Sequence, residues 1–413
     1  MDYDEAIEWL YGTQLFGIKL GLEGTKHLFD KLNLFDALEG CEVIHVAGTN
    51  GKGSTCAMID SICRSAGKRS GLFTSPHLIS FRERIRVNGA MIPENEAAKI
   101  LTELRKEVND WETPPTFFEL AAALAVKYFC QQKVEVMVME TGMGGRLDAT
   151  NVLQSSVSVI TSVDLDHQEW LGEDLETIAQ EKAGIMKSEV PVIVSSCQDK
   201  AVLRVFDHFA EKHNAPLLKV SSSDWKSPQE TKLKGQHQRL NAALAAKAVS
   251  TLWPDLSEST INRGLSEVSW PGRFDLISGN IVIDGAHNPA AIKALISTWT
   301  EEFGHGTLAT IVFGAADSKE VSAILTALGA IAQRFIFVKL SAKRGLKVPA
   351  LEAALIESEA REIPWSEASD VSDAIRQAKS TKLPVLVTGS LFLAGEVLAL
   401  DSGTESSYEL SEQ

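Results

Sequence analysis

The sequence predicts an α/β protein with two domains: a P-loop-type, doubly wound, mostly parallel sheet domain and a smaller Rossmann-like α/β domain. Three observations predict this class. Short β-branched runs alternate with helical segments along most of the chain, as expected for a parallel sheet. A glycine-rich turn joins the first strand, 43–46, to a helix at 54–66. The Pro-Gly pair at 271–272 follows a short helix and precedes a new βα series.

Length and composition are those of an ordinary globular protein. The chain has 413 residues, 44% of them apolar and 23% charged, so two to three domains are expected. The net charge of −15 argues against a nucleic-acid surface. Five cysteines without a C-x-x-C pair predict a reducing, cytoplasmic setting. The sequence has neither a signal-peptide pattern nor an apolar run of membrane-spanning length, so no membrane partner is expected.

The first predicted domain covers 1–270 and begins with a helical lead-in over 1–41. Three alternating arginines, Arg82, Arg84 and Arg86, would share one face of a strand, with a solvated edge strand as the plainer interpretation. The remaining predicted strands are 69–73, 134–139, 157–162 and 190–195, and the predicted helices are 93–110, 116–130, 174–187 and 237–252.

The second predicted domain covers 274–400, and the boundary lies at Trp270–Phe274. Its strands are predicted at 281–284, 308–313, 335–340 and 384–388, with helices from 289, after 318 and between the later strands. The acidic, serine-rich tail 401–413 is predicted to be disordered.

The turn 48–54, GTNGKGS, has the features of a phosphate-binding loop. Its glycines allow backbone N–H groups to face an anion at a helix N-terminus, and Lys52 adds a positive charge. The match to G-x-x-x-x-G-K-[ST] is imperfect, because Val46 holds the first glycine position and Gly53 is inserted before Ser54. An ordinary glycine-rich βα turn is the alternative.

Further residues suit phosphoryl transfer to a carboxylate, which must be activated before it acylates an amine. Glu140 ends a buried strand, where open α/β sheets commonly hold a nucleotide metal. Lys52 and Arg273 are the candidate cations, and Ser54, Glu140 and His167 are the candidate metal ligands. A hydrogen-bonding histidine at a strand end is the alternative for His167.

Eleven segments in order resemble the folylpolyglutamate synthase/dihydrofolate synthase branch of the Mur ligase superfamily. They span nearly all of 21–396 and read GLEG, HVAGTNGKGS, TSPHL with ERIRVNG, FFE, ETGMGGRLDATN, DHQEWLG, EKAGIMK, HQRLN, WPGRF, DGAHNP and TGSLFLAGE. The resemblance implies a ligase of the EC 6.3.2 class that joins L-glutamate to dihydropteroate, to a reduced folate, or to both, through an acyl phosphate.

The resemblance also implies a nucleotide and metal site. Mg²⁺, with two ions expected, would be held by Ser54, Glu140 and His167, and a K⁺ ion is compatible with the family. Lys182 would carry a CO₂-derived carbamate and serve as a further metal ligand, whereas the plain alternative is an ammonium paired with Glu181 or a phosphate. In the implied ATP site, Asn241 would contact the adenine, Arg273 the phosphates and Asp284 the ribose. The loop residues implied in ATP binding are Thr49, Asn50, Gly51, Lys52, Gly53, Ser54 and Thr55.

The organic substrates have their own implied residues. The pteridine end would lie near Leu22, Thr116 and Phe118, with Arg146 and Asp148 close by, and the incoming glutamate near His287 and Ser390. Further residues implied in substrate binding are Ser75, Pro76, His77 and Arg82. The residues implied in catalysis are Lys52, Lys182, Arg273 and His287. Taken singly, Asn241 could be a helix-surface residue, Asp284 a strand-end cap and Ser390 a helix N-cap.

Two rival functions are compatible with a nucleotide-binding loop. A Mur ligase acting on a UDP-sugar peptide normally carries a UDP-binding domain before the loop, and only about forty residues precede it here. A nucleotide-binding module of the GTPase kind should contain Asn-Lys-x-Asp, which the sequence lacks. The sequence leaves open the balance of the two activities, the preferred folate and the polyglutamate length. A monomer is expected.

Overall fold

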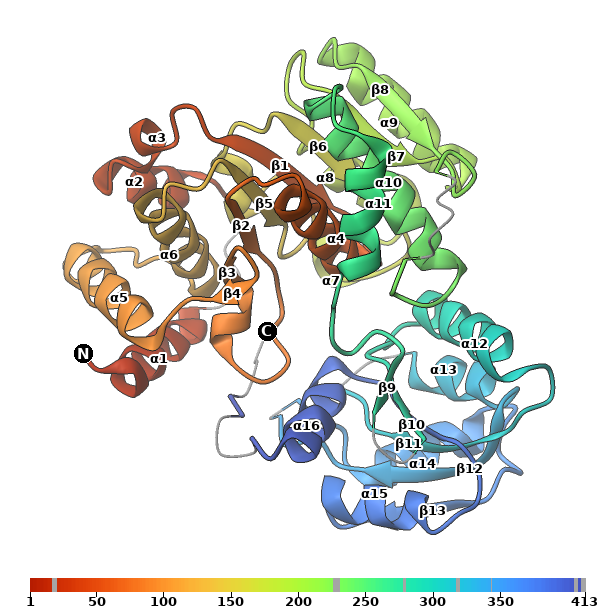
Figure 1. Cartoon of the computed structure of the whole chain (residues 1–413). Helices are drawn as coiled ribbons and strands as arrows, with labels where there is room; N and C mark the ends of the chain where they lie inside the picture. The colour runs from red at the N-terminus through yellow and green to blue at the C-terminus, as the bar shows by residue number, and fades with distance from the viewer. Residues whose placement is uncertain are drawn as a thin grey trace. The chain divides into compact units, whose positions relative to one another are not determined.

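The computed structural model describes residues 1–16, 21–225, 231–277, 280–316, 320–342, 344–404 and 408–409. The chain forms two compact units (Figure 1). The first comprises 1–76, 82–232 and 238–268, and the second comprises 77–81, 233–237 and 269–413. The boundary proposed at Trp270–Phe274 stays a prediction. Within the described residues, no helix is long and apolar enough to cross a membrane.

The first unit is built on an eight-stranded sheet of order β4-β3-β2-β5-β1-β6-β7-β8. All neighbours from β2 to β8 run parallel, whereas β3 and β4 are antiparallel additions at one edge. This confirms the predicted doubly wound, mostly parallel sheet. The strands are β1 Glu42–Ala47, β2 Ser70–Phe73, β3 Ile85–Val87, β4 Ala90–Met91, β5 Val136–Glu140, β6 Val157–Ile160, β7 Val192–Ser195 and β8 Leu217–Val220.

Helices cover this sheet, so its central strands are buried along nearly their whole length, as in parallel sheets with both faces covered. Helices α4 and α11 pack so closely that a Cβ on Gly264 would lie 2.5 Å from the Ile62 Cα. The α-helices of the unit are α1 Tyr3–Gly12, α2 Glu23–Lys31, α3 Leu34–Ala37, α4 Lys52–Ser65, α5 Glu94–Val108, α6 Phe117–Gln131, α7 Gln168–Leu171, α8 Leu175–Ala183, α9 Lys200–Lys212, α10 Gln236–Leu252 and α11 Glu258–Glu267.

The predicted arginine face on a strand is wrong. Residues Phe81–Arg84 form a 3₁₀ helix, and only Arg86 lies on β3. The 3₁₀ turn places Phe81 and Arg84 three residues apart on its buried side, where both are fully buried. The Arg84 guanidinium lies 5.2 Å from the centre of the Phe117 ring, and Arg82 pairs with Glu94 at 3.2 Å.

Several elements differ in extent from the sequence prediction. Helix α4 begins at Lys52, two residues before the predicted start, and α8 ends at Ala183 rather than at residue 187. Helix α9 and strand β8 were not predicted, and neither were β9 Asp275–Ile277 and β13 Trp365–Ala368. The 17–20 part of the lead-in and the 226–230 part of the loop before α10 lie outside the described residues.

The second unit contains a six-stranded sheet of order β13-β12-β11-β14-β10-β9, parallel except for β9. Alternate residues of β10 fall into two separate cores, with Val282 in one and Ile281 and Ile283 in the other. Both faces of the sheet are therefore covered, as in the predicted Rossmann-like arrangement. Its remaining elements are β10 Ile281–Ile283, β11 Ala309–Phe313, β12 Ala332–Val338, β14 Val385–Thr388, α12 Pro289–Phe303, α13 Val321–Leu328, α14 Val348–Glu357, α15 Val371–Lys379 and α16 Leu391–Ser402.

The disordered tail over 401–413 stays a prediction, and the structure describes 401–404 and 408–409 of it. Helix α16 continues to Ser402. Glu409 is tied to the 77–81 segment: its N–H donates to the Ile79 carbonyl at 2.7 Å, and its carboxylate accepts from the Phe81 N–H at 2.7 Å. Its carbonyl lies 3.1 Å from His77 Nε2, so paired hydrogen bonds hold this residue in place. The tail residues 405–407 and 410–413 lie outside the described part.

Candidate active site

The glycine-rich loop leaves the end of β1 and is held by the end of β6. Gly48 has φ 148°, and a Cβ there would lie 1.8 Å from Thr161 Oγ1. The Thr161 hydroxyl donates to the Asn50 carbonyl at 2.8 Å, and the Thr49 N–H donates to the Ser162 carbonyl at 2.7 Å. A side chain at position 48 would collide with Thr161 and prevent these contacts, so the loop conformation depends on glycine at this position.

Lys52 begins α4 and folds back over the loop. Its Nζ donates to the carbonyls of Gly48 and Thr49 at 3.1 and 3.2 Å. Gly51 precedes it as the N-cap, with φ 88°, in the left-handed region that favours glycine. The first turn of a helix leaves N–H groups without helical partners, so an anion at this end would meet both N–H groups and a lysine.

Three side chains join this turn to α10. Gln238 donates from Nε2 to Ser54 Oγ at 3.3 Å and accepts through Oε1 from Asn241 Nδ2 at 3.0 Å. All three are at least 95% buried. A Cβ on Gly51 would lie 2.6 Å from Asn241 Oδ1, so α10 packs directly against the loop. The alternative of Asn241 as a helix-surface residue is therefore wrong, whereas its contact with adenine stays a prediction.

Glu140 ends β5 beside the loop, opposite Val46 of β1 in the sheet register. Its side chain is buried, and its Oε2 accepts from the Ser75 N–H at 3.1 Å. Burial raises the pKa of the Cys56 thiol on α4, the Glu140 charge raises it further, and the Lys52 charge opposes the shift. The charges of Glu140 and Lys52 therefore act on the same buried thiol of α4, with opposite sign.

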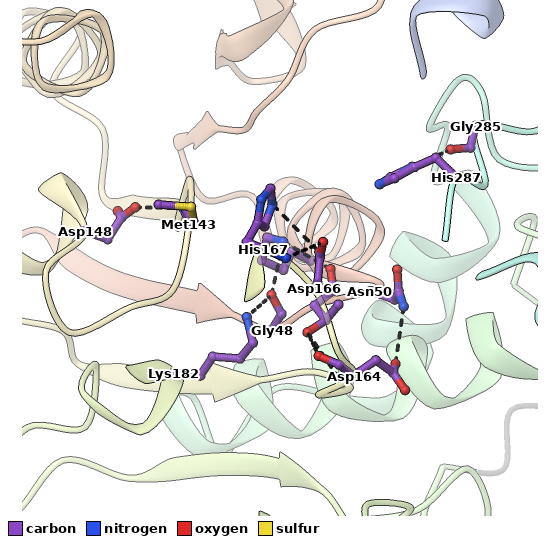
Figure 2. A network of polar contacts seen from close by, with 12 residues as sticks. Gly48, Asn50, Met143, Asp148, Asp164, Asp166, His167, Lys182, Gly285 and His287 are labelled. Atoms are coloured by element: carbon purple, nitrogen blue, oxygen red, sulfur yellow. Dashed lines mark hydrogen bonds and ion pairs between the residues drawn. The ribbon is translucent and has the colours of Figure 1, made fainter. Parts of the chain in front are cut away.

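The segment after β6 supplies further carboxylates to the loop (Figure 2). Asp164 Oδ2 accepts from Asn50 Nδ2 at 3.3 Å, and the Thr49 hydroxyl bonds to the Asp164 backbone at 3.1 Å. His167 has φ 47°, its side chain is 54% exposed, and its Nε2 lies 3.8 Å from Asp166 Oδ2. His167 therefore stands near the loop on a solvent-accessible segment.

Lys182 reaches the loop from α8. Figure 2 shows its side chain directed at Gly48, whose carbonyl accepts from Nζ at 2.9 Å. The pKa of Lys182 is lowered from its ordinary value to about 7. Burial is the main cause and the charge of Lys52 adds to it, whereas the carboxylates of Asp166, Asp148 and Asp164 oppose the shift. The alternative of an ion pair with Glu181 is wrong, since Glu181 pairs with Arg146 at 2.8 Å.

Asp148 organises the loop that follows Glu140. Its carboxylate accepts from the N–H groups of Gly142 and Met143 at 2.8 and 3.1 Å, and from both the N–H and the hydroxyl of Thr150. Burial raises its pKa, and these hydrogen bonds oppose the shift. A carboxylate with four donors already in place works first as the internal tie of this loop, and its contact with substrate stays a prediction.

Other residues predicted for the pteridine end lie on the same unit. A Cβ on Gly142 would lie 2.6 Å from the tip of the Phe118 ring, so this ring packs against the 142–148 loop. Thr116 caps α6 and shares the Glu119 carboxylate with Thr25 of α2. Leu22 is the N-cap residue of α2.

In the second unit, Asp284 follows β10 and is buried. Its two carboxylate oxygens accept from the N–H groups of Phe274 and Ala286 at 2.9 and 2.8 Å. Burial raises its pKa, and the charge of Arg273 opposes the shift. His287 Nδ1 lies 2.9 Å from the Gly285 carbonyl, and Ser390 caps α16. The cap interpretations of Asp284 and Ser390 are confirmed, and their roles toward ribose and glutamate stay predictions.

Sequence reasoning missed three residues that connect the first unit's site. These are Gln238, Asp164 and Asn151, whose Nδ2 bonds the carbonyls of Arg146 and Gly184 at 3.0 Å. Asn151 and Gln238 lie inside the ETGMGGRLDATN and HQRLN segments, whereas Asp164 lies two residues after the predicted strand 157–162. Gln238 stands one helical turn before Asn241. That spacing is the signal that could have indicated it.

The oxygen donors around the loop suit a hard divalent cation. Glu140 and Ser54 supply a buried carboxylate and a hydroxyl, and Asp164 and Asp166 lie on the next strand end. Among the described residues, however, no set of three or more His, Cys, Asp or Glu side chains is already gathered as a metal cage. Phosphate and water oxygens would have to complete the coordination, as is usual for Mg²⁺.

Comparisons with known proteins place this geometry in a class. Residues 46–247 match the Mur ligase middle domain, and residues 272–391 match the Mur ligase glutamate ligase domain. The class is that of the Mur ligases.

More specific relatives cover nearly the whole chain. The dihydrofolate synthase/folylpolyglutamate synthase of Bacillus subtilis is 34% identical over 96% of this chain and 98% of its own length. The enzyme of the same name from Escherichia coli is 32% identical over 92% of this chain and 91% of its own. The chain therefore belongs to the dihydrofolate synthase/folylpolyglutamate synthase family.

Solved structures agree. The folylpolyglutamate synthase of Mycobacterium tuberculosis, complexed with ADP and AMPPCP, superposes with a TM-score of 0.85 at 28% identity, over 97% of this chain and 99% of that one. E. coli FolC in complex with DHPP and ADP gives a TM-score of 0.85 at 29% identity, over 96% and 98%.

Proposed function

We propose that this protein is an ATP-dependent ligase that joins L-glutamate to dihydropteroate, to reduced folates, or to both. The observation that carries the proposal is the loop 48–54, with Lys52 and the first turn of α4 at one end and the buried Glu140 carboxylate beside it. Relatives of this family bind ADP, DHPP, and Mn with AMPPNP and L-glutamate. This combination of groups suits phosphoryl transfer from ATP, in which a loop, a metal and cations stabilise the charge on the phosphate oxygens.

In the proposed reaction, the pteroate or folate carboxylate attacks the γ-phosphorus of ATP, and ADP leaves as the new acyl–phosphate bond forms. The glutamate amine then attacks the acyl carbon, inorganic phosphate leaves, and the amine loses a proton to solvent. Lys52 and the N–H groups of the α4 turn bind the phosphate oxygens and stabilise the charge that spreads over them during transfer.

A divalent cation would be held by Ser54 and Glu140, with His167 joining from the exposed segment after β6. When bound, it would supply positive charge that stabilises the phosphate oxygens during transfer. Thr49, Asn50, Gly53 and Thr55 complete the loop, and Asn241 is proposed to contact the adenine. Arg273 is proposed to contact the phosphates and Asp284 the ribose. His287 and Ser390 are proposed to bind the incoming glutamate. A second Mg²⁺ and a K⁺ ion also belong to the proposal.

Lys182 is proposed to carry a carbamate. Its neutral amine would attack the carbon of CO₂, forming the N–C bond and releasing one proton to solvent. Supporting this, its pKa of about 7 leaves much of the amine neutral near neutral pH, because the side chain is buried and Lys52 is near. The carbamate would replace a cation beside the metal with an oxygen ligand.

The pteridine end of the substrate is proposed to lie near Leu22, Thr116 and Phe118, with Arg146 and Asp148 close by. Ser75, Pro76, His77 and Arg82 are proposed as further substrate-binding residues. We further propose a cytoplasmic monomer. All five cysteines are described and free, which suits a reducing compartment.

The experiment measures ADP release with glutamate and the organic acceptor supplied separately and together. A ligase releases ADP at full rate only when both are present, and an ¹⁸O-labelled acceptor carboxylate transfers label to the released phosphate. ADP release that is independent of both would instead indicate a nucleotide-binding module with background hydrolysis. Label retained entirely in the amide product would contradict the acyl phosphate.

A further inference from the structure

The side chain of Gln238 lies between two residues with separate proposed tasks. Asn241 is proposed to contact the nucleotide base, and Ser54 to bind the metal. Gln238 bonds both, at 3.0 and 3.3 Å, and is 1% exposed. Residues 238 and 241 are three apart on α10, so both side chains project from the same helix face toward the loop.

The direction of these hydrogen bonds follows from the chain of donors. Because Asn241 Nδ2 donates to Gln238 Oε1, the Gln238 amide nitrogen faces Ser54 and donates to its Oγ. This bond occupies one lone pair of the Ser54 oxygen. The second lone pair then remains for a cation, and the hydroxyl group cannot rotate freely.

Burial protects these hydrogen bonds from exchange with water. Ser54 is 1% exposed and Asn241 is 5% exposed, so bulk water does not readily replace the Gln238 amide. Gly51 lets Asn241 approach the loop, because any Cβ there would meet its amide at 2.6 Å. The amide chain is therefore fixed at both ends.

We propose that Gln238 is a positioning residue, which orients the Ser54 hydroxyl for the nucleotide-bound divalent cation and couples it to the base contact of Asn241. The inference rests on the nucleotide and metal site proposed above. It predicts that losing the Gln238 amide weakens the metal-dependent part of nucleotide binding more than the metal-free part.

The test uses AMPPNP as the probe and compares its dissociation constant without and with Mn²⁺ by calorimetry. The ratio of the two constants is the gain in affinity due to the metal. Gln238→Met keeps the side-chain length but removes both hydrogen bonds, and we expect the gain to fall about tenfold, equivalent to about 1.4 kcal/mol. The metal-free dissociation constant should change less than threefold.

A double-mutant cycle identifies the route of the effect. If Gln238 acts through Ser54, the change Gln238→Met should lower the gain by less than twofold when Ser54→Ala is already present. Gln377→Met is the matched control: it removes a half-buried glutamine with hydrogen bonds to Ser366 and Asp373 on elements that carry none of the proposed site residues. The gain should stay unchanged in this control.

Thermal unfolding without ligand separates positioning from folding. If Gln238→Met does not yield folded protein, Gln238→Asn replaces it, because an amide shortened by one methylene cannot reach both partners. An equal loss in the Ser54→Ala background, or an equal loss of metal-free and metal-dependent binding, would overturn the inference. A wild-type protein that shows no metal-dependent gain would instead refute the proposed nucleotide and metal site.

Discussion

A methyl group at Gly51 tests whether the contact between α10 and the loop supports nucleotide binding. Gly51→Ala imposes two costs that the structure separates. The backbone has φ 88°, where an L-residue costs roughly 1–2 kcal/mol. The new Cβ would also lie 2.6 Å from Asn241 Oδ1 and 3.0 Å from its Nδ2, so the amide must move by several tenths of an ångström.

Gly67→Ala is the matched control. Gly67 has φ 76°, and its Cβ would meet nothing within 4 Å, so this variant carries the backbone cost alone. A smaller conformational entropy of the unfolded chain returns about 0.4–1 kcal/mol in both variants. We expect Gly67→Ala to lose about 1 kcal/mol of stability and Gly51→Ala to lose more, because its Cβ also displaces the buried Asn241 amide. Only Gly51→Ala should lose nucleotide affinity, by about tenfold, because the proposed Asn241 contact with the nucleotide is displaced.

Denaturant unfolding measures the first quantity, and calorimetric titration with AMPPNP and Mn²⁺ measures the second. Equal nucleotide affinity in Gly51→Ala and Gly67→Ala would refute the argument, because the Asn241 contact would then have no part in binding. A Gly67→Ala protein with weakened nucleotide binding would refute it too, since the backbone cost alone would explain the effect.

Three further predictions use other parts of the first unit. Lys52→Ala should reduce ligation more than about a hundredfold while cooperative unfolding is kept, because charge stabilisation of phosphoryl transfer is lost; near-normal turnover would contradict the phosphate-loop assignment. Lys182→Ala and Lys182→Arg should both be nearly inactive, with partial rescue of the alanine variant by a small carboxylate, and full activity of the arginine variant would exclude the carbamate. Burial lowers the pKa of His45 to about 3, so stability is complete above its ordinary value near 6.5 and falls as the pH decreases toward 3. Urea titrations of His45→Gln should lack this contribution, about 1.4 kcal/mol per pH unit for one proton, and an unchanged pH slope would contradict it.

The central sheet could be predicted because its strands are buried on both faces. Runs such as Val43–Val46 are apolar except for His45, and each is followed by a helical pattern of adequate length. The strand predicted from the alternating arginines at 82–86 is wrong because a local pattern was read without its distant partner. An alternation of arginines reads as a strand, but Arg84 is buried against Phe117, a residue 33 positions away that local pattern does not reveal.

The site was predictable where one motif holds its own geometry and not where distant segments meet. The loop 48–54 could be predicted from the spacing of its glycines and from Lys52. The Gln238 contact with Ser54 joins residues 184 positions apart, and the anchoring of Glu409 depends on the 77–81 segment. Composition predicts a disordered tail because it is acidic and rich in serine, and it gives no sign of the hydrogen bonds that the Glu409 carboxylate accepts from Ser80 and Phe81.

The most direct test of the account supplies ATP, Mg²⁺ and L-glutamate to the purified protein with dihydropteroate or tetrahydrofolate, each separately, and identifies the products by mass. The account predicts that at least one acceptor gains a glutamyl residue, with one ADP formed for each amide bond. The relative yield from the two acceptors would measure the balance of the two activities. Absence of a glutamylated product from both acceptors, in a folded protein that binds AMPPNP, would contradict the central claim.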